Sequence, residues 1–416
     1  MPHDVQPSPF TPSQYPTLPE IEGVRLASFE AGIRYRGRHD LLLVRFDRGT
    51  QVAGVLTRSK TGSAPVAWCR EHLPGGYARA LVVNAGNANA FTGVKGAEAA
   101  QITAKAAAEA IGCGPHEVFL ASTGVIGEPM DASAFAHHLA QMAETAKPAS
   151  ARWEEAARCI MTTDTYPKLA TVEATIDGVP VTLNGICKGS GMIAPDMATM
   201  LAFVFTDAAV PAPVLQALLS DVNARTFNCM SVDGDTSTSD TALMFATGFA
   251  DHDVVTMDDA ASPRLASFRD ALFTLMRDLA IQTAKDGEGL TKFITLKVSG
   301  ADHFEAARRI GLAIANSPLV KTAFAGEDAN WGRIVMAVGK AGEAADRDKL
   351  SIRFGDVAVA RNGERVADYD EAVVAAYMKG DSLEVHIDVG VGQGTATVWT
   401  CDLTHGYISI NADYRS

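Results

Sequence analysis

The sequence predicts an α/β protein with a larger core, residues 19–289, and a smaller C-terminal α+β domain, residues 290–416. The length of 416 residues supports this division, because one compact core rarely extends over so long a chain. Apolar runs of strand length alternate with amphipathic stretches up to Asp286–Gly289, and short strands predominate after it. Residues 1–18 are rich in Pro and Ser, which break both periods, and are expected to form a flexible leader.

The first part of the chain alternates strand and helix patterns. An Ala-rich stretch with interspersed Lys and Glu favours a helix at Val94–Ile111, and Asp131 is a plausible N-cap for the next helix. Asp177–Gly178 supplies the residues that a tight hairpin turn needs. The expected elements are a hairpin of Leu41–Phe46 and Val52–Leu56, strands at Leu81–Asn84 and Val118–Ser122, helices at Val94–Ile111 and Asp131–Ala146, and a hairpin of Ala170–Ile176 and Pro180–Leu183.

The second part begins with an apolar strand and ends in short strands. A polar loop rich in Asp, Ser and Thr, residues 231–240, separates two amphipathic helices. The expected strands are Leu201–Phe205, Thr291–Val298, Leu350–Phe354, Leu383–Val389, Thr395–Asp402 and Tyr407–Asn411. The expected helices are Pro211–Arg225, Ser262–Ala284, Asp302–Asn316, Asn330–Val338 and Tyr369–Lys379.

Composition excludes several classes of protein. A formal net charge of −13 argues against a surface for nucleic acid or anionic membrane. The N-terminus lacks the basic and apolar regions of a signal peptide, and apolar runs such as Met200–Phe205 are too short to span a bilayer. The six cysteines lie far apart, which favours isolated reduced thiols over zinc ligands or disulfides. We therefore expect a cytoplasmic protein that handles small molecules.

Familiar cofactor and metal signatures are absent from the sequence. There is no H-E-x-x-H, no G-x-S-x-G and no phosphate-binding P-loop. Gly189–Gly191 lacks the third glycine of a dinucleotide fingerprint. Asp233–Asp235 resembles the start of a calcium loop, but Met244 stands where that loop needs an acid. The pair His137–His138 reads as a solvated helix face. We expect neither a metal nor a cofactor.

One glycine-rich segment, KGSGMIAPDMATML at Lys188–Leu201, stands out for its chemistry. Thr199 stands at the entrance of an apolar strand, where an ordinary β-branched residue would also fit. Alternatively, Thr199 is a latent nucleophile, whose hydroxyl attacks the carbonyl of Ala198 and forms an ester. Hydrolysis of that ester frees an α-amino group, which has an ordinary pKa near ~7.7–8 and can serve as a general base without a histidine.

This segment resembles the cleavage-site signature of the bifunctional ornithine acetyltransferase/N-acetylglutamate synthase family, also called glutamate N-acetyltransferases. The resemblance covers essentially everything after the leader, with the motifs in family order. It implies the layered α-β-β-α core of that family and of the self-cleaving DmpA-type aminopeptidases. The other matching segments are VVNAGNANAFTG (Val82–Gly93), STGVIGEP (Ser122–Pro129), MTTDTYPK (Met161–Lys168), VDGDTSTSD (Val232–Asp240), DGEGLTKF (Asp286–Phe293), GEDANWGRI (Gly326–Ile334) and INADYRS (Ile410–Ser416).

The resemblance implies cleavage between Ala198 and Thr199, which gives an α chain of residues 1–198 and a β chain of residues 199–416 in an α2β2 assembly. The mature Thr199 would take the acetyl group of N2-acetylornithine and pass it to glutamate, with ping-pong kinetics. The resemblance leaves open whether acetyl-CoA is also a substrate.

The resemblance also implies roles for individual residues. Thr123 and Gly124 match the family's oxyanion hole. We expect Lys188 to face the substrate's α-carboxylate and Glu288 to face a substrate amino group. The full set of expected substrate contacts is Thr162, Lys188, Thr199, Glu288, Asn411 and Ser416. Thr162 is favoured over Thr163 by its place in the motif, and no role is assigned to Val232–Asp240 or Gly326–Ile334.

Two other functions remain as alternatives. A self-cleaving hydrolase resembling the β-peptidyl aminopeptidases would use water in place of glutamate, and the INADYRS and DGEGLTK segments argue against it. A non-catalytic binding protein on the same scaffold is disfavoured because the residues that the chemistry needs are present.

Overall fold

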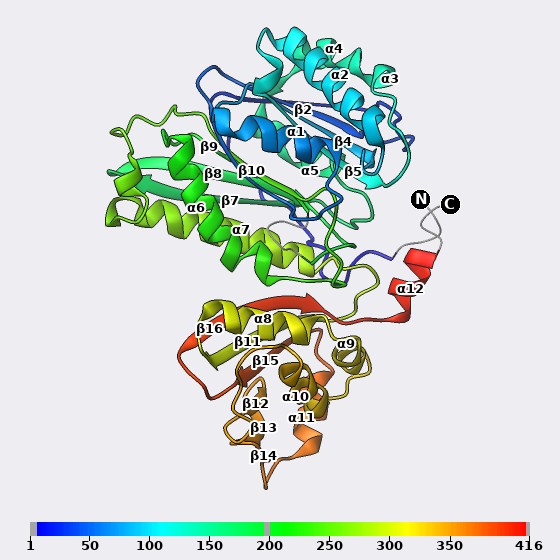
Figure 1. The fold of residues 1–416 in the computed structure, drawn as a ribbon, viewed down its shortest axis with the longest axis vertical. Coiled ribbons are helices and arrows are strands. Elements are labelled where there is room, and N and C mark those ends of the chain that lie inside the picture. Colours follow the sequence, from blue (N-terminus) through cyan, green and yellow to red (C-terminus); the bar gives the residue numbers. More distant parts are fainter. Residues whose placement is uncertain (1–5, 195–199, 413–416) are drawn as a thin grey trace.

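The computed structural model describes residues 6–194 and 200–412, and their strands form three sheets (Figure 1). The first sheet has the order β5-β4-β2-β1-β6, from β1 (Val24–Phe29), β2 (Leu41–Phe46), β4 (Ala80–Asn87), β5 (Val118–Val125) and β6 (Lys147–Pro148). The second has the order β3-β10-β9-β8-β7, from β3 (Gln51–Leu56), β7 (Lys168–Ile176), β8 (Val179–Lys188), β9 (Leu201–Thr206) and β10 (Thr241–Ala246).

These two sheets pack face to face, and the strand pattern of β9 shows why. Leu201, Phe203 and Phe205 point into the layer between the sheets, where they join a cluster that includes Phe46 and Phe119 of the first sheet. The alternate residues of β9 pack instead against the helices on the outer face of the second sheet. Successive side chains of a strand point to opposite faces, so a strand that is apolar throughout is buried on both.

Helices cover the outer face of each sheet. Outside the first sheet lie α1 (Ala64–His72), α2 (Gly93–Ile111), α3 (Ser133–Ala136) and α4 (His138–Thr145), and outside the second lie α6 (Ala212–Arg225) and α7 (Ala266–Ala284). A further helix, α5 (Trp153–Cys159), inserts Trp153 into the inner layer. The layers therefore run helix, sheet, sheet, helix, and the expected α/β class with α-β-β-α layers is confirmed (Figure 1).

The third sheet is built entirely after Gly289, in the lower part of Figure 1. Its order is β14-β13-β12-β15-β11-β16, from β11 (Phe293–Ala301), β12 (Ser351–Phe354), β13 (Val357–Arg361), β14 (Glu364–Arg365), β15 (Ser382–Asp388) and β16 (Gly394–Cys401). Helices α8 (Phe304–Ala315), α9 (Pro318–Ala325), α10 (Trp331–Gly339) and α11 (Glu371–Met378) accompany it. The last helix, α12 (His405–Ala412), leaves this sheet and returns toward the core.

Three expectations about local structure were wrong. β2 and β3 do not form a hairpin, since β2 pairs with β1 and β4 while β3 crosses to the facing sheet and pairs with β10. The stretch expected as a strand at Tyr407–Asn411 is helical, as part of α12. The expected helix at Asp131–Ala146 is two short helices that meet at His137.

The stretch expected as a flexible leader contacts the core in its described part. Ser8 donates from its Oγ to the carbonyl of Lys285 at 2.6 Å, Phe10 packs edge-on against Phe293, and Leu18 is fully buried. Ser8 and Phe10 thus lie where the core meets the third sheet, whereas Leu18 joins the layer between the first two sheets.

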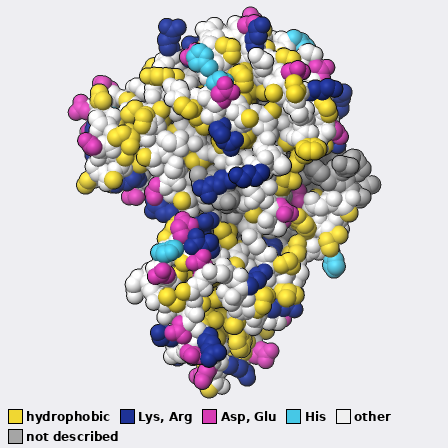
Figure 2. Space-filling view, viewed as in Figure 1, with side chains coloured by type: hydrophobic (Ala, Val, Ile, Leu, Met, Phe, Trp, Pro, Cys, Tyr) yellow, Lys and Arg dark blue, Asp and Glu magenta, His cyan; other side chains and the backbone are white. Residues whose placement is uncertain are grey.

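The surface carries charges of both signs. Acidic and basic side chains are interspersed with apolar ones over the face shown in Figure 2. Among the helices that the structure describes, none is long and apolar enough to cross a membrane.

Candidate active site

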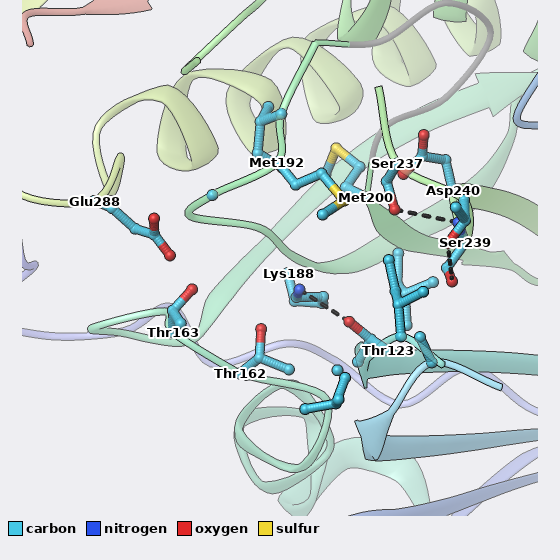
Figure 3. A pocket seen from close by; sticks show the side chains of 18 of the residues that line it. Thr123, Thr162, Thr163, Lys188, Met192, Met200, Ser237, Ser239, Asp240 and Glu288 are labelled. Atoms are coloured by element: carbon cyan, nitrogen blue, oxygen red, sulfur yellow. Dashed lines mark hydrogen bonds between the residues drawn. The ribbon is translucent and has the colours of Figure 1, made fainter. Parts of the chain in front are cut away.

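A cavity of about 300 Å³ lies where the ends of β5 and β8 meet the beginning of β9 (Figure 3). Residues far apart in the sequence meet around it. Six residues singled out from the sequence line it: Thr123, Gly124, Thr162, Lys188, Glu288 and Asn411. Three others, Ala198, Thr199 and Ser416, lie outside the described residues. On either side of residues 195–199 the chain lines the cavity, at Ile193 and again at Met200.

Thr123 and Gly124 lie near the end of β5, where its parallel pairing with β4 becomes irregular. Gly124 has a φ of +127°, which disfavours any residue with a side chain. A Cβ at Gly124 would lie 2.2 Å from the carbonyl carbon of Gly86, so the two backbones can approach this closely only at glycine. The sequence therefore brings the backbone of Gly124 to the cavity wall, in a conformation that its neighbours enforce.

Lys188 ends β8 and brings a buried cation to the cavity. Its side chain is 8% exposed, and Nζ donates to Thr123 Oγ1 at 3.1 Å. Burial lowers the pKa of Lys188, while the carboxylates of Asp164 and Glu288 raise it. A buried ammonium group beside an open cavity is suited to bind a carboxylate.

A fully buried ion cluster supports this wall from behind. Lys168 Nζ lies 2.6 Å from carboxylate oxygens of both Asp164 and Asp286. Asp164 also accepts hydrogen bonds from the backbone N–H groups of Thr162 (3.0 Å) and Gly189 (2.6 Å). The nearby cation of Lys168 holds the pKa of Asp164 below its usual value despite burial. The cluster thus joins the MTTDTYPK, KGSG and DGEG segments into one unit.

Glu288 stands at the opposite end of the cavity from the serine-rich loop (Figure 3). Asn411 Nδ2 donates to Glu288 Oε2 at 2.6 Å. Burial raises the pKa of Glu288, and hydrogen bonds from Asn411 and Thr163 partly offset this effect. Thr162 and Thr163 both line the cavity, and Figure 3 shows Thr163 directed toward Glu288.

The polar loop Val232–Asp240, to which the sequence assigned no role, forms another wall. Ser237, Thr238, Ser239 and Asp240 line the cavity. Near the beginning of the loop, Asp233 accepts hydrogen bonds from the backbone of Met192 (2.7 Å) and Ile193 (2.9 Å) and from the hydroxyl of Tyr407 (3.2 Å). The only sequence feature that could have pointed to these cavity residues was the richness in Asp, Ser and Thr, and it indicated only a loop.

Metal ligands do not cluster in the part of the chain that the structure describes. There, no group of three or more His, Cys, Asp or Glu side chains is placed to hold a metal ion. The segment Gly326–Ile334 is not among the residues that line the cavity, and its Asn330 caps α10 by accepting from the backbone N–H of Arg333.

Comparison with known proteins gives the same reading over nearly the whole chain. The model of the ArgJ family matches residues 25–416. The arginine biosynthesis bifunctional protein ArgJ of Brucella suis is 58% identical over 410 residues, which cover 98% of this chain and 99% of that protein. Two solved structures also match. The Bacillus halodurans ArgJ protein is 40% identical, covers 51% of this chain and 99% of its own, and has a TM-score of 0.49. The ornithine acetyltransferase of Mycobacterium tuberculosis, solved in complex with ornithine, is 33% identical, covers 43% of this chain and 96% of its own, and has a TM-score of 0.39. The motif resemblance is thereby confirmed, and the chain belongs to the ArgJ family.

Proposed function

We propose that this chain moves the acetyl group of N2-acetylornithine to glutamate through an acetyl ester on Thr199, after cutting its own Ala198–Thr199 bond. Its family places it among the enzymes of arginine biosynthesis. The names of two relatives support an acetyl transfer that involves ornithine, one being called bifunctional and the other an ornithine acetyltransferase.

The observation that carries the proposal is the pairing of opposite charges across one small cavity. Lys188 presents a cation and Glu288 an acid to the same space of about 300 Å³. An amino-acid derivative carries a carboxylate, which suits Lys188, and an amino group, which suits Glu288. Asn411 and Thr162 add polar groups to the lining of the same cavity, as a site of this kind needs.

The same cavity supports acyl transfer by a threonine. When the Thr199 hydroxyl attacks the acetyl carbonyl, its proton passes to the freed α-amino group of the same residue. The carbonyl oxygen becomes negative, and donors at Thr123 and Gly124 would stabilise it. Lys188 Nζ is within hydrogen-bond distance of Thr123 Oγ1 and orients that hydroxyl. Protonation of the departing nitrogen releases ornithine. The amine of glutamate then attacks the ester, which forms N-acetylglutamate and releases the Thr199 oxygen as its hydroxyl.

The assembly and location are proposed from the same family resemblance. We propose that residues 1–198 and 199–416 remain paired after cleavage and form an α2β2 enzyme in the cytoplasm. The reaction needs no metal or bound cofactor, since the hydroxyl and amine of Thr199 supply the nucleophile and base. Acetyl-CoA would act as a second acetyl donor in a bifunctional enzyme.

Intact-mass measurement under denaturing conditions tests self-cleavage directly. The active enzyme should give two fragments, the second beginning at Thr199, and Thr199→Ala should stay uncut and inactive. A single full-length chain in active enzyme would disprove the mechanism.

Product analysis tests the reaction. With N2-acetylornithine and glutamate, the proposal expects N-acetylglutamate in step with ornithine, whereas free acetate would indicate the hydrolase. Replacing N2-acetylornithine by acetyl-CoA then shows whether the enzyme only recycles acetyl groups or also starts the pathway.

A further inference from the structure

Self-cleavage poses a problem that the mature enzyme does not have. If Thr199 acts as proposed above, its nitrogen lies in the Ala198–Thr199 amide bond of the precursor and cannot serve as a base. Another group must take the hydroxyl proton, and a proton must reach the amide nitrogen before the C–N bond breaks. The precursor therefore needs an acid–base group that the mature reaction does not require.

Three titratable side chains line the cavity among the described residues: Lys188, Glu288 and Asp240. Asn411 and Thr163 hydrogen-bond Glu288, and Lys188 donates to the hydroxyl of Thr123. Asp240 also accepts hydrogen bonds, from Ser237 and Thr57, but it differs from Glu288 and Lys188 in one carboxylate oxygen. Its side chain is 1% exposed, and its Oδ2 has no hydrogen-bond partner in the part of the chain that the structure describes. A buried polar atom without a partner is costly, so its retention at a cavity wall points to a use.

The backbone holds Asp240 close to Met200. The next residue, Thr241, donates its N–H to the carbonyl of Met200 at 2.9 Å, where β10 and β9 start as parallel neighbours. Met200 directly follows Thr199 in the sequence. In Figure 3 Asp240 and Met200 lie on the same side of the cavity, across from Glu288.

The loop that ends in Asp240 also holds the chain before the cleavage site. Asp233 accepts from the N–H groups of Met192 and Ile193, as described above. Val232 donates to the carbonyl of Ile193 at 2.7 Å, and Thr236 donates to the carbonyl of Ala194 at 2.9 Å. The loop therefore binds the backbone before residues 195–199, and Thr241, which directly follows the buried carboxyl group of Asp240, binds the backbone after them.

The surroundings of Asp240 suit proton exchange. Burial raises the pKa of Asp240 well above its ordinary value, while hydrogen bonds from Ser237 and Thr57 and the cation of Lys188 on β8 lower it. A carboxyl group that gains and loses its proton closer to neutral pH is a more effective acid and base than an exposed one.

We propose that Asp240 is the acid–base group of self-cleavage. As the carboxylate, it takes the proton of the Thr199 hydroxyl while the hydroxyl oxygen bonds to the carbonyl carbon of Ala198. It then returns the proton to the Thr199 nitrogen as the C–N bond breaks, which leaves an ester and a free amine. Water hydrolyses the ester into the Ala198 carboxylate and the Thr199 hydroxyl, and the new amine is the base of the mature enzyme.

The test follows the full-length chain from the moment of its synthesis. Wild type, Asp240→Asn and the matched control Asp235→Asn are made in a cell-free system with labelled Met, and the two fragments are followed on denaturing gels. Asp235 is an exposed acid of the same loop, so D235N should cleave at the wild-type rate. D240N should cleave about 10²–10⁴ times more slowly, the usual contribution of a general acid–base group. Cleavage of D240N within a few-fold of wild type would overturn the proposal.

Hydroxylamine, which cuts esters, identifies the step that is blocked. If Asp240 acts in ester formation, D240N stays intact in hydroxylamine. A D240N chain that hydroxylamine cuts at Thr199 has formed the ester, which overturns the assignment.

Should D240N not fold, Asp240→Ala with added formate decides, because formate can occupy the space of the lost carboxyl group. Cleavage restored by formate supports the role, and D240A cleavage at the wild-type rate without formate contradicts it. If the wild type itself stays uncut, the proposed function fails. If the wild type is cut and the D240 variants are cut equally fast, only this inference fails.

Discussion

Asn411 donates from its Nδ2 to Oε2 of Glu288 at 2.6 Å, across 123 residues of sequence. The bond exists because α12 leaves the third sheet and returns to the cavity, where Tyr407 also reaches Asp233. A residue near the C-terminus thus sets the orientation of an acid in the core, and the substrate cavity depends on the whole chain rather than on the core alone.

Loss of this bond should weaken substrate binding without unfolding the enzyme. In Asn411→Ala, Glu288 loses a donor to its carboxylate, which raises its pKa further and frees its side chain. A single hydrogen bond is worth about 1 kcal/mol, so the KM for N2-acetylornithine should rise about fivefold. Ser409→Ala, an exposed change on the same helix, should leave the KM unchanged. Equal KM values for both variants would remove Asn411 from the site.

The charge of Glu288 should control the pH dependence of N2-acetylornithine binding. Burial raises its pKa above the ordinary 4.5, so the KM for N2-acetylornithine should rise as the pH falls through this raised value. In Glu288→Gln the KM should be about 10–100-fold higher and independent of pH over this range, because a charged hydrogen bond is lost. Glu98→Gln, an exposed acid on α2, should keep the wild-type profile.

Thermal unfolding separates this effect from a loss of folding. A carboxyl group whose folded pKa lies above its unfolded pKa costs stability as the pH rises above 4.5, when the unfolded chain ionises more readily. E288Q removes that cost, so its melting temperature at pH 8 should equal or exceed that of the wild type. A marked fall would show that Glu288 has a structural role instead.

Gly124 should tolerate no side chain. Its positive φ is one obstacle, and the backbone of Gly86 is a second that no side-chain movement can relieve. Gly124→Ala should displace a proposed oxyanion donor and lower kcat by about 10²–10³. Gly127→Ala is the matched control, since it also has a positive φ, +87°, but its Cβ would meet nothing within 4 Å. It should keep kcat within a few-fold, and an equal loss in both variants would implicate strain alone.

The sequence predicted the strands and helices of the core well where their period was strong. Leu201–Phe205 and Val94–Ile111 match β9 and α2 to within one residue at each end. The turn at Asp177–Gly178 was also predictable, because both residues adopt the positive φ that such a turn demands. Local chemistry determines these features, so they can be read from local sequence.

Features set by distant contacts were not predictable from the local pattern. β2 and β3 follow each other closely and looked like a hairpin, yet they belong to facing sheets because β10 rather than β2 pairs with β3. Tyr407–Asn411 alternates like a strand but is helical in α12. Asp240 was part of a recognised motif, but its burial and its unpartnered Oδ2 depend on the pairing of β9 with β10, which the local sequence does not specify.

The ion cluster behind the cavity should be essential for stability. Lys168→Met keeps the bulk of the side chain but leaves the carboxylates of Asp164 and Asp286 buried without their cation. Removing one partner of a buried ion pair costs about 3–5 kcal/mol, so the free energy of unfolding in denaturant should fall by that amount at pH 7. Lys105→Met, whose side chain is 69% exposed, should change it by less than about 0.5 kcal/mol.

The deficit of K168M should shrink in acid. In the wild type, Lys168 holds the pKa of Asp164 below the ordinary 3.8, so this stabilisation is present above 3.8 and is lost as the pH falls through the folded value. Without the cation, the buried carboxylates protonate more easily, which removes the buried charge from the variant. The unfolding curves of K168M and the wild type should therefore lie closer together at pH 4 than at pH 7. A deficit of the same size at both pH values would indicate lost packing instead.

Thr162 and Thr163 should prove to have different roles, although both line the cavity. The backbone of Thr162 is anchored to Asp164, which leaves its hydroxyl for the substrate, whereas the Thr163 hydroxyl bonds Glu288 and lowers its pKa. Thr162→Val should raise the KM about fivefold at every pH, the cost of one hydrogen bond. Thr163→Val should instead move the KM profile to higher pH, because Glu288 loses a donor to its charged form. KM measured from pH 5 to pH 9 for both isosteric variants distinguishes the two effects. If T162V shifts the profile and T163V raises the KM uniformly, Thr163 is the substrate contact and the preference for Thr162 is wrong.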